Sequence, residues 1–274
     1  MKLATLRLED GPHVARVDDG GYVDLGPGDV GTLLATRPDW RAWAESVDGP
    51  TIDVEPTQLA PVVPRPGKIL CVGLNYRTHI TEMGRDLPEY PTLFAKYTET
   101  LIGPHDAVVL PPESDSVDWE AELVVVIGTK VRRADRAAAE AAIAGYTVMN
   151  DVSMRDWQFR TKEWLQGKTW EASTPLGPYL LTADALAPDA GISCEIDGES
   201  VQKSTIADLV FDAADLVSYI STMITLNPGD IIATGTTGGV GHARKPPRYL
   251  EAGQTLVTAV EGIGAMSNPV RRES

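Results

Sequence analysis

Short apolar segments, separated by turn residues, run through the whole chain. Near the N-terminus apolar positions alternate with polar ones, and this period-two pattern predicts three strands, over residues 2–8, 13–17 and 22–25. A helical stretch containing Trp40 and Trp43 follows, and then a proline-rich connector. We therefore predict a small N-terminal α/β domain over residues 1–60 and a larger domain over residues 66–272.

Strand patterns dominate the larger region too. Apolar runs rich in β-branched residues predict strands over residues 68–73, 123–128, 146–150, 178–182, 192–196, 231–234 and 255–260. An alanine-rich stretch over residues 136–143 predicts a surface helix. A second helix is predicted after Asp212, because the apolar side chains share one helical face at Leu216, Tyr219, Ile220, Met223 and Ile224. Strands and helices do not alternate regularly, which favours a β-rich α+β fold over a doubly wound sheet.

Composition narrows the class of protein. The chain has 274 residues, of which 43% are hydrophobic, and a net charge of −15. This charge argues against nucleic-acid or anionic-membrane partners, which require a basic surface. The chain has no apolar run of about 18 residues, and its N-terminus has a strand pattern rather than that of a signal peptide. Its two cysteines, Cys71 and Cys194, suggest a reducing compartment, so we expect a cytoplasmic protein.

Candidate chemistry is concentrated where a polar stretch enters the apolar run at residues 123–128. Side chains alternate across a strand, so Glu120 and Glu122 point to the same face, and Asp118 is able to join them. Carboxylates that are close together and buried repel one another, and a hard divalent cation such as Mg²⁺ would compensate for this. The alternative is an edge strand with a solvated acidic face. Asp151 ends another predicted strand and would complete a set of three carboxylates; otherwise it is a turn cap.

His79 and Glu82 are three residues apart, and one helical turn would bring them onto the same face. A carboxylate beside an imidazole raises its basicity, as a base that deprotonates water requires. The alternative is an exposed polar loop. Lys168 is a candidate fixed cation for an anionic substrate, or otherwise a surface lysine.

A glycine-rich loop over residues 234–241 offers backbone N–H groups to a carboxylate or phosphate, or is a plain turn. It matches neither the Walker A loop nor the Rossmann fingerprint. His242 follows this loop without a defined role, and we expect His13 and His105 to lie on the surface.

Taken together, these residues resemble the fumarylacetoacetate hydrolase family over residues 66–272. The resemblance is carried by seven blocks in order: Gly73-Leu74-Asn75-Tyr76, His79 with Glu82, Pro91 with Leu93, Phe94 and Lys96, Glu120 with Glu122, Asp151 with Arg155, Asp156 and Gln158, Gly167-Lys168, and Gly235-Thr236 with Gly239-Val240-Gly241. It implies a mixed β-sandwich roll, usually in a homodimer, that holds Mg²⁺ or Mn²⁺.

The resemblance also implies roles for individual residues. The expected metal ligands are Glu120, Glu122 and Asp151. The expected catalytic groups are His79 with Glu82, which activate water, and Lys168, the cation beside the metal. The expected contacts to substrate carboxylate or oxyanion groups are Lys96, Arg155, Gln158 and Thr236.

The reaction that this resemblance implies is hydrolysis of a C–C bond in a 2,4-dioxo acid such as an acylpyruvate, a small anionic substrate. The metal would stabilise the departing enolate while activated water attacks the distal carbonyl. Two alternatives use the same site without water attack: decarboxylation of oxaloacetate-like acids and keto–enol isomerisation. A non-catalytic ligand-binding protein is a further alternative. Departures from the family pattern at Leu74, Thr237 and Trp170-Glu171 affect the expected pocket rather than the metal ligands.

Overall fold

The computed structural model describes residues 1–18, 21–82, 84 and 86–273. Most strands belong to one 11-stranded sheet with the order β4-β3-β2-β1-β13-β11-β10-β16-β5-β6, in which β7 also pairs with β13. Its strands are β1 (Lys2–Leu8), β2 (Gly11–Asp18), β3 (Gly21–Pro27), β4 (Thr51–Ile52), β5 (Ile69–Gly73), β6 (Thr92–Lys96), β7 (Leu101–Ile102), β10 (Ala121–Ile127), β11 (Ile143–Asn150), β13 (Thr174–Thr182) and β16 (Ile231–Thr236).

A second sheet has five strands in the order β15-β14-β17-β18-β8. Its strands are β8 (Val108–Leu110), β14 (Gly191–Ile196), β15 (Glu199–Thr205), β17 (Thr255–Val260) and β18 (Gly264–Arg272). A further two-stranded pair is made by β9 (Val117–Asp118) and β12 (Ser153–Met154). The α-helices are α1 (Val30–Thr36), α2 (Trp40–Ser46), α3 (Arg77–Glu82), α4 (Arg136–Ala141), α5 (Arg155–Gln158) and α6 (Ala213–Met223).

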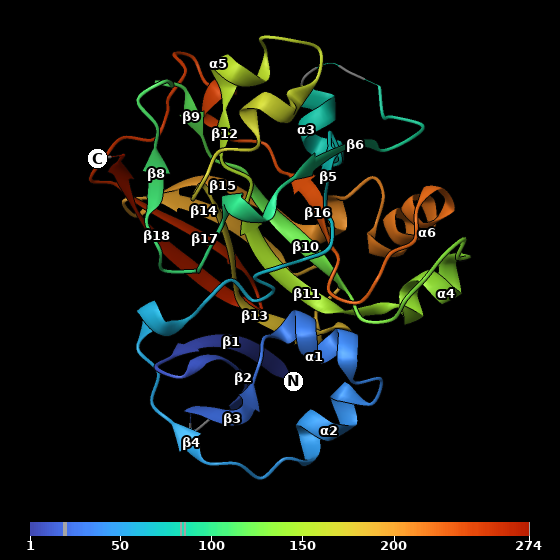
Figure 1. Cartoon of the computed structure of the whole chain (residues 1–274). Helices are drawn as coiled ribbons and strands as arrows, with labels where there is room; N and C mark the ends of the chain where they lie inside the picture. The colour runs from blue at the N-terminus through green and yellow to red at the C-terminus, as the bar shows by residue number, and fades with distance from the viewer. Residues whose placement is uncertain (19–20, 83, 85, 274) are drawn as a thin grey trace.

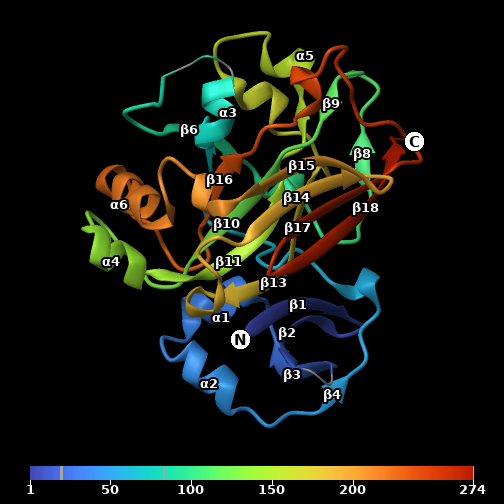
Figure 2. The same ribbon diagram turned by 180° about the vertical axis from the view of Figure 1, so that it is seen from behind.

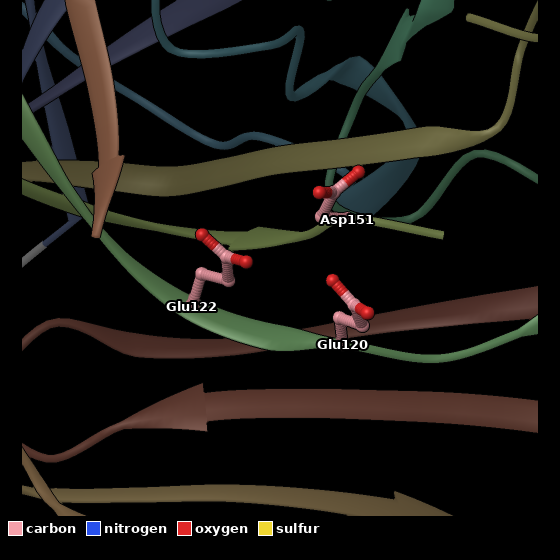
Figure 3. A group of neighbouring side chains, drawn as sticks. All are labelled: Glu120, Glu122 and Asp151. Carbon is pink, nitrogen blue, oxygen red and sulfur yellow. The ribbon is translucent and has the colours of Figure 1, made fainter. Parts of the chain in front are cut away.

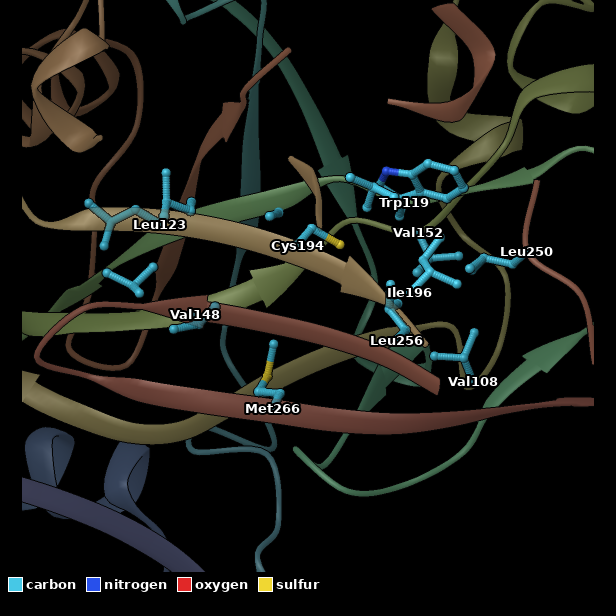
Figure 4. Packing of buried hydrophobic residues seen from close by; sticks show 14 of the residues in the cluster. Val108, Trp119, Leu123, Val148, Val152, Cys194, Ile196, Leu250, Leu256 and Met266 are labelled. Atoms are coloured by element: carbon cyan, nitrogen blue, oxygen red, sulfur yellow. The ribbon is translucent and has the colours of Figure 1, made fainter. Parts of the chain in front are cut away.

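The two larger sheets face each other across the main apolar core (Figures 1 and 2). Leu123 and Val148 of the large sheet belong to the same buried cluster as Cys194, Leu256 and Met266 of the small one (Figure 4). Apolar side chains on the inner faces of two sheets are the usual core of a sandwich. The predicted β-rich mixed fold is therefore confirmed.

Strand β10 lies in the interior of the large sheet, between β11 and β16, and all seven of its residues are buried. Its apolar run packs on both sides, because Leu123 joins the core between the sheets while Val125 packs with Leu216 of α6. This burial on both faces explains why the run is continuous rather than alternating. It also means that carboxylates at the start of β10 are held in the protein interior.

Helix α6 begins as the sequence predicts, with a reciprocal capping box between Asp212 and Asp215. Its apolar face is different from the one expected. Leu216 and Ile220 are buried, but Met223 is 54% and Ile224 is 46% exposed, because the helix ends at Met223.

The N-terminal strands and the helices α1 and α2 form a lobe at one end of the molecule (Figure 1). The large sheet nevertheless continues into this lobe, because β1 pairs with β13 through Lys2 opposite Leu181. Leu3 and Val30 also pack in one apolar cluster with Val124 of β10. The domain boundary between residues 60 and 66 therefore stays a prediction.

Three further points concern the remaining predictions. His13 was expected on the surface, but it is buried, because its ring nitrogens contact Asp24 and Asp10. Cys71 and Cys194 are free and buried. None of the described helices is long and apolar enough to cross a membrane.

Candidate metal centre

Three carboxylates converge where β10 begins and β11 ends. Glu122 lies in β10 and Glu120 directly before it, while Asp151 follows the last residue of β11. The pairing of Ala121 with Asn150 aligns these two strand ends. Each of the three side chains offers an oxygen, and these oxygens lie within 4.8 Å of one another. In Figure 3 Glu120 and Glu122 rise from the same side of β10 toward Asp151.

Two buried lysines neutralise part of this charge. Lys168 Nζ lies 2.7 Å from Glu120 Oε2 and 2.9 Å from Asp151 Oδ2. Lys96 Nζ lies 2.7 Å from Asp151 Oδ1. Burial lowers the pKa of Lys168, but Asp151 and Glu120 raise this pKa by more, so the ammonium stays charged. Burial likewise raises the pKa of Asp151, but Lys168 and Lys96 hold it below its usual value.

Arg155 and Asp118 form a second ion-paired group beside Glu120. Arg155 Nε lies 2.8 Å from Asp118 Oδ2, and its Nη1 lies 2.7 Å from Glu120 Oε1. Asp118 also accepts hydrogen bonds from the backbone N–H groups of Gly241 and His242. The side chain of Asp118 therefore anchors the loop after β16 to Arg155 and is not a member of the carboxylate triad.

Glu122 differs from the other two carboxylates in its surroundings. It is 1% exposed, and its Oε2 accepts a hydrogen bond from the backbone N–H of Gly235. Burial raises the pKa of Glu122 well above its usual value, and Asp151 and Glu120 raise it further.

The donor set fits a hard divalent cation. Four buried carboxylates are grouped with three buried cations: Asp118, Glu120, Glu122 and Asp151 with Lys96, Lys168 and Arg155. When all four carboxylates are ionised, negative charge is therefore in excess, and Glu122 is the carboxylate that no described lysine or arginine contacts. Mg²⁺ and Mn²⁺ take carboxylate oxygens as ligands and would compensate for this charge. Glu120, Glu122 and Asp151 are the residues that would hold such an ion.

Glu120 and Glu122 of the triad line a cavity of about 440 Å³, whereas Asp151 is not among its lining residues. Its lining includes Glu120, Glu122, Lys168, Arg155, Gln158, Thr236, Phe94, Trp164, Val240 and His242. The Thr236 hydroxyl donates to the backbone carbonyl of Ala121 and accepts from Gln202 Nε2. Arg155 Nη1 donates to Gln158 Oε1, which turns the amide nitrogen of Gln158 away from Arg155.

The structure thus brings most of the predicted site residues together. The exceptions are of two kinds. Lys96 and Asp151 contact each other, and neither is among the residues that line the cavity. His79 and Glu82 lie in α3, but their side chains are outside the described part of the structure, so their predicted role as a dyad stays a prediction.

Sequence reasoning missed one feature of the cavity and left another without a role. The Trp164 ring forms a wall against Gly73, where an added Cβ would lie 2.3 Å from Trp164 Cζ3. No sequence signal joins residues so far apart. His242 lines the cavity as well, and its position after the glycine-rich loop was the available signal.

Comparison with known proteins agrees with this geometry. Residues 68–271 match the sequence model of a family described as fumarylacetoacetate (FAA) hydrolase C-terminal. The mitochondrial oxaloacetate tautomerase of Rattus norvegicus is 46% identical over 217 residues, which cover 78% of this chain and 69% of the relative.

Two solved structures cover 100% of this chain and are themselves covered over 100%. A fumarylacetoacetate hydrolase from Exiguobacterium antarcticum is 30% identical, with a TM-score of 0.89. A 5-carboxymethyl-2-hydroxymuconate delta-isomerase from Mycobacterium smegmatis is 32% identical, with a TM-score of 0.84. The resemblance seen in the sequence is confirmed.

Proposed function

This chain belongs to the fumarylacetoacetate hydrolase family, and from that premise we propose that it is a divalent-metal-dependent enzyme that interconverts the keto and enol forms of an oxaloacetate-like 2-oxo acid. The observation that carries the proposal is the convergence of Glu120, Glu122 and Asp151 beside Lys168, where Glu120, Glu122 and Lys168 line the cavity. An acidic triad with a fixed cation suits a reaction in which negative charge develops on a carbonyl oxygen.

The relatives favour this reaction over the C–C hydrolysis that the sequence first suggested. The relative from Rattus norvegicus is named an oxaloacetate tautomerase, and one matched structure is named an isomerase. Hydrolysis remains the second candidate, supported by the matched structure that is named a fumarylacetoacetate hydrolase.

The residues of the chain divide the work between binding and charge stabilisation. Mg²⁺ or Mn²⁺ held by the triad would supply the Lewis acidity that stabilises an enolate. Lys168 stays protonated and is held in place by Glu120 and Asp151, so it adds a fixed positive charge without reorganising during the reaction. Arg155 and Gln158 line the same cavity and are the proposed contacts for substrate oxygens. The apolar walls formed by Phe94, Trp164 and Val240 restrict water.

The test is a turnover assay on oxaloacetate and an acylpyruvate, with Mg²⁺ and with a chelator. Wild type is compared with Glu122→Ala and His79→Ala, and Glu140→Ala on the exposed face of α4 is the control. The rate at which the enol absorbance decays should depend on Mg²⁺. This rate should be more than about a hundredfold lower in Glu122→Ala than in wild type. His79→Ala should keep this activity, because tautomerisation needs no activated water.

Metal-dependent acylpyruvate cleavage that is lost in both variants would support the hydrolase instead. Release of CO₂ from oxaloacetate, retained in His79→Ala, would identify a decarboxylase. An inactive wild type on both substrates would contradict the proposed substrate class.

We also keep two proposals about the state of the protein in the cell. A homodimer is proposed from the family resemblance, and light scattering at low protein concentration tests it. A cytoplasmic location is proposed from the cysteine usage, whereas the relative from Rattus norvegicus is named as mitochondrial. Localisation of a tagged full-length chain distinguishes the two compartments.

A further inference from the structure

His242 lies at the mouth of the cavity with its ring held on two sides. It belongs to a short 3₁₀ helix, η6 (Gly241–Ala243), which Asp118 anchors through the backbone N–H groups of Gly241 and His242 at 2.7 and 2.9 Å. The imidazole packs on Phe159 with ring centroids 5.2 Å apart, and its Nδ1 lies 3.0 Å from the hydroxyl of Tyr249. Among the described residues, no group is within hydrogen-bond distance of Nε2.

The residues that line the cavity are buried at its floor and exposed at its mouth. Glu122 and Lys168, each 1% exposed, lie at the floor. At the mouth Phe159 is 56% exposed, and His242 is exposed beside it. A 2-oxo acid that places its carbonyl end at the acidic triad therefore directs its other end toward the mouth.

Several other hydrogen-bond donors in the cavity already have partners within the protein. Lys168 Nζ is bonded to two carboxylates, and the Thr236 hydroxyl donates to a backbone carbonyl. Arg155 uses Nε on Asp118 and Nη1 on Glu120 and Gln158, and its Nη2 remains a proposed contact for the 2-oxo acid end beside Glu120. The amide nitrogen of Gln158 is also available, but Gln158 is 5% exposed, whereas Phe159 and His242 at the mouth are exposed.

We propose that His242 Nε2 is the contact for the second carboxylate of a dicarboxylic 2-oxo acid, and that it makes the cavity selective for dicarboxylates. This inference rests on the proposed function, because it assumes that the 2-oxo end occupies the triad. A second carboxylate is repelled by the acidic floor and by the net charge of −15. It is stabilised only beside a local donor, and the packing on Phe159 and Tyr249 holds the imidazole ready for it.

Binding of two unreactive probes tests this selectivity without requiring turnover. Malate and 2-hydroxybutyrate share the 2-hydroxy acid end and differ in having a carboxylate or a methyl group at the far end. Dissociation constants are measured by calorimetry with Mg²⁺ present. His242→Phe keeps an aromatic ring against Phe159 but removes the donor, whereas His242→Gln keeps an N–H donor. His105→Phe, away from the cavity, is the matched control.

Wild type and His105→Phe should bind malate more tightly than 2-hydroxybutyrate. His242→Phe should lose about tenfold of this preference, as expected for one hydrogen bond to a charged group, without weaker binding of 2-hydroxybutyrate. His242→Gln should keep part of the preference. For oxaloacetate turnover, the same order should be seen in KM, with kcat little changed.

An equal preference in wild type and His242→Phe overturns the inference, as does a wild type that binds neither probe or does not distinguish them. Equal weakening of both probes in His242→Phe also overturns it, because the ring would then only support the cavity wall. Failure of the proposed function would be recognised differently. The protein would then prefer malate in a way that depends on His242, but it would not tautomerise oxaloacetate.

Discussion

At the scale of single residues, the site is a balance of buried charges in which Glu122 is the least compensated. The other carboxylates are contacted by Lys96, Lys168 and Arg155. Glu122 instead accepts a hydrogen bond from the backbone N–H of Gly235. A neutral side chain of the same shape at position 122 should therefore make the metal-free protein more stable, whereas the ionised carboxylate is needed to bind the metal.

Glu122→Gln is expected to stabilise the metal-free protein by about 1–3 kcal/mol, because an uncompensated buried charge is costly. The raised pKa of Glu122 determines how this stabilisation changes with pH. A carboxyl that holds its proton more tightly in the folded state loses stability as pH rises above its unfolded pKa, so the gain should be larger at pH 7 than at pH 4. The difference in the free energy of unfolding between wild type and Glu122→Gln is measured by urea unfolding in the presence of a chelator. Calorimetry should show that Mg²⁺ binding is lost; unchanged Mg²⁺ affinity would remove Glu122 from the ligand set.

At the scale of elements, strand pairing places side chains that the sequence leaves apart. His13 in β2 lies opposite β3, where Asp24 Oδ1 is 3.0 Å from its Nδ1, and Asp10 contacts its Nε2 at 3.2 Å. The hydrogen bond to Asp24 is the largest cause of the raised pKa of His13, and burial opposes it.

This hairpin predicts a pH-dependent stability. A histidine with a raised folded pKa contributes stability that is fully present below its unfolded pKa of about 6.5 and is lost as pH rises through the folded pKa. The free-energy difference between wild type and His13→Gln should therefore be larger at pH 6 than at pH 9, measured by urea unfolding. His105→Gln provides the comparison. A difference that does not vary with pH would contradict a charged His13 in the folded hairpin.

The elements also show where sequence patterns were sufficient. The buried run of β10 and the start of α6 after Asp212 are local signals, and both were predicted close to their observed bounds. Helix α1 and strand β18 were missed, and in β18 the alternation of apolar and polar residues is interrupted around Asn268 and Pro269. The exposed Ile224 shows the opposite error: the predicted apolar pattern continued past Met223, where the helix ends.

At the scale of the whole molecule, the large sheet joins the N-terminal lobe to the part that holds the site. Strand β13 pairs with β1 on one side and with β11, which leads into Asp151, on the other. Buried Leu3 and Leu34 of the lobe belong to the same apolar cluster as Val124.

Removal of residues 1–60 should therefore expose an edge of β13 and part of this cluster. We expect residues 61–274 to aggregate or to lose cooperative thermal unfolding, as measured by size-exclusion chromatography and calorimetry, with the full chain as control. A truncated chain that is monodisperse and unfolds cooperatively would show that the predicted boundary separates two independent domains.

The sequence by itself determined the class of fold, the carboxylate triad and the family, because these depend on local periodicity and on short motifs in a fixed order. Tertiary structure alone decided how the charges are paired. Asp118 neutralises Arg155 and anchors the His242 loop, and Lys96 supports Asp151 away from the cavity lining. Such pairings join positions distant along the chain, and Coulomb energy depends on distance in space rather than in sequence. For the same reason the sequence did not predict the wall that Trp164 forms against Gly73.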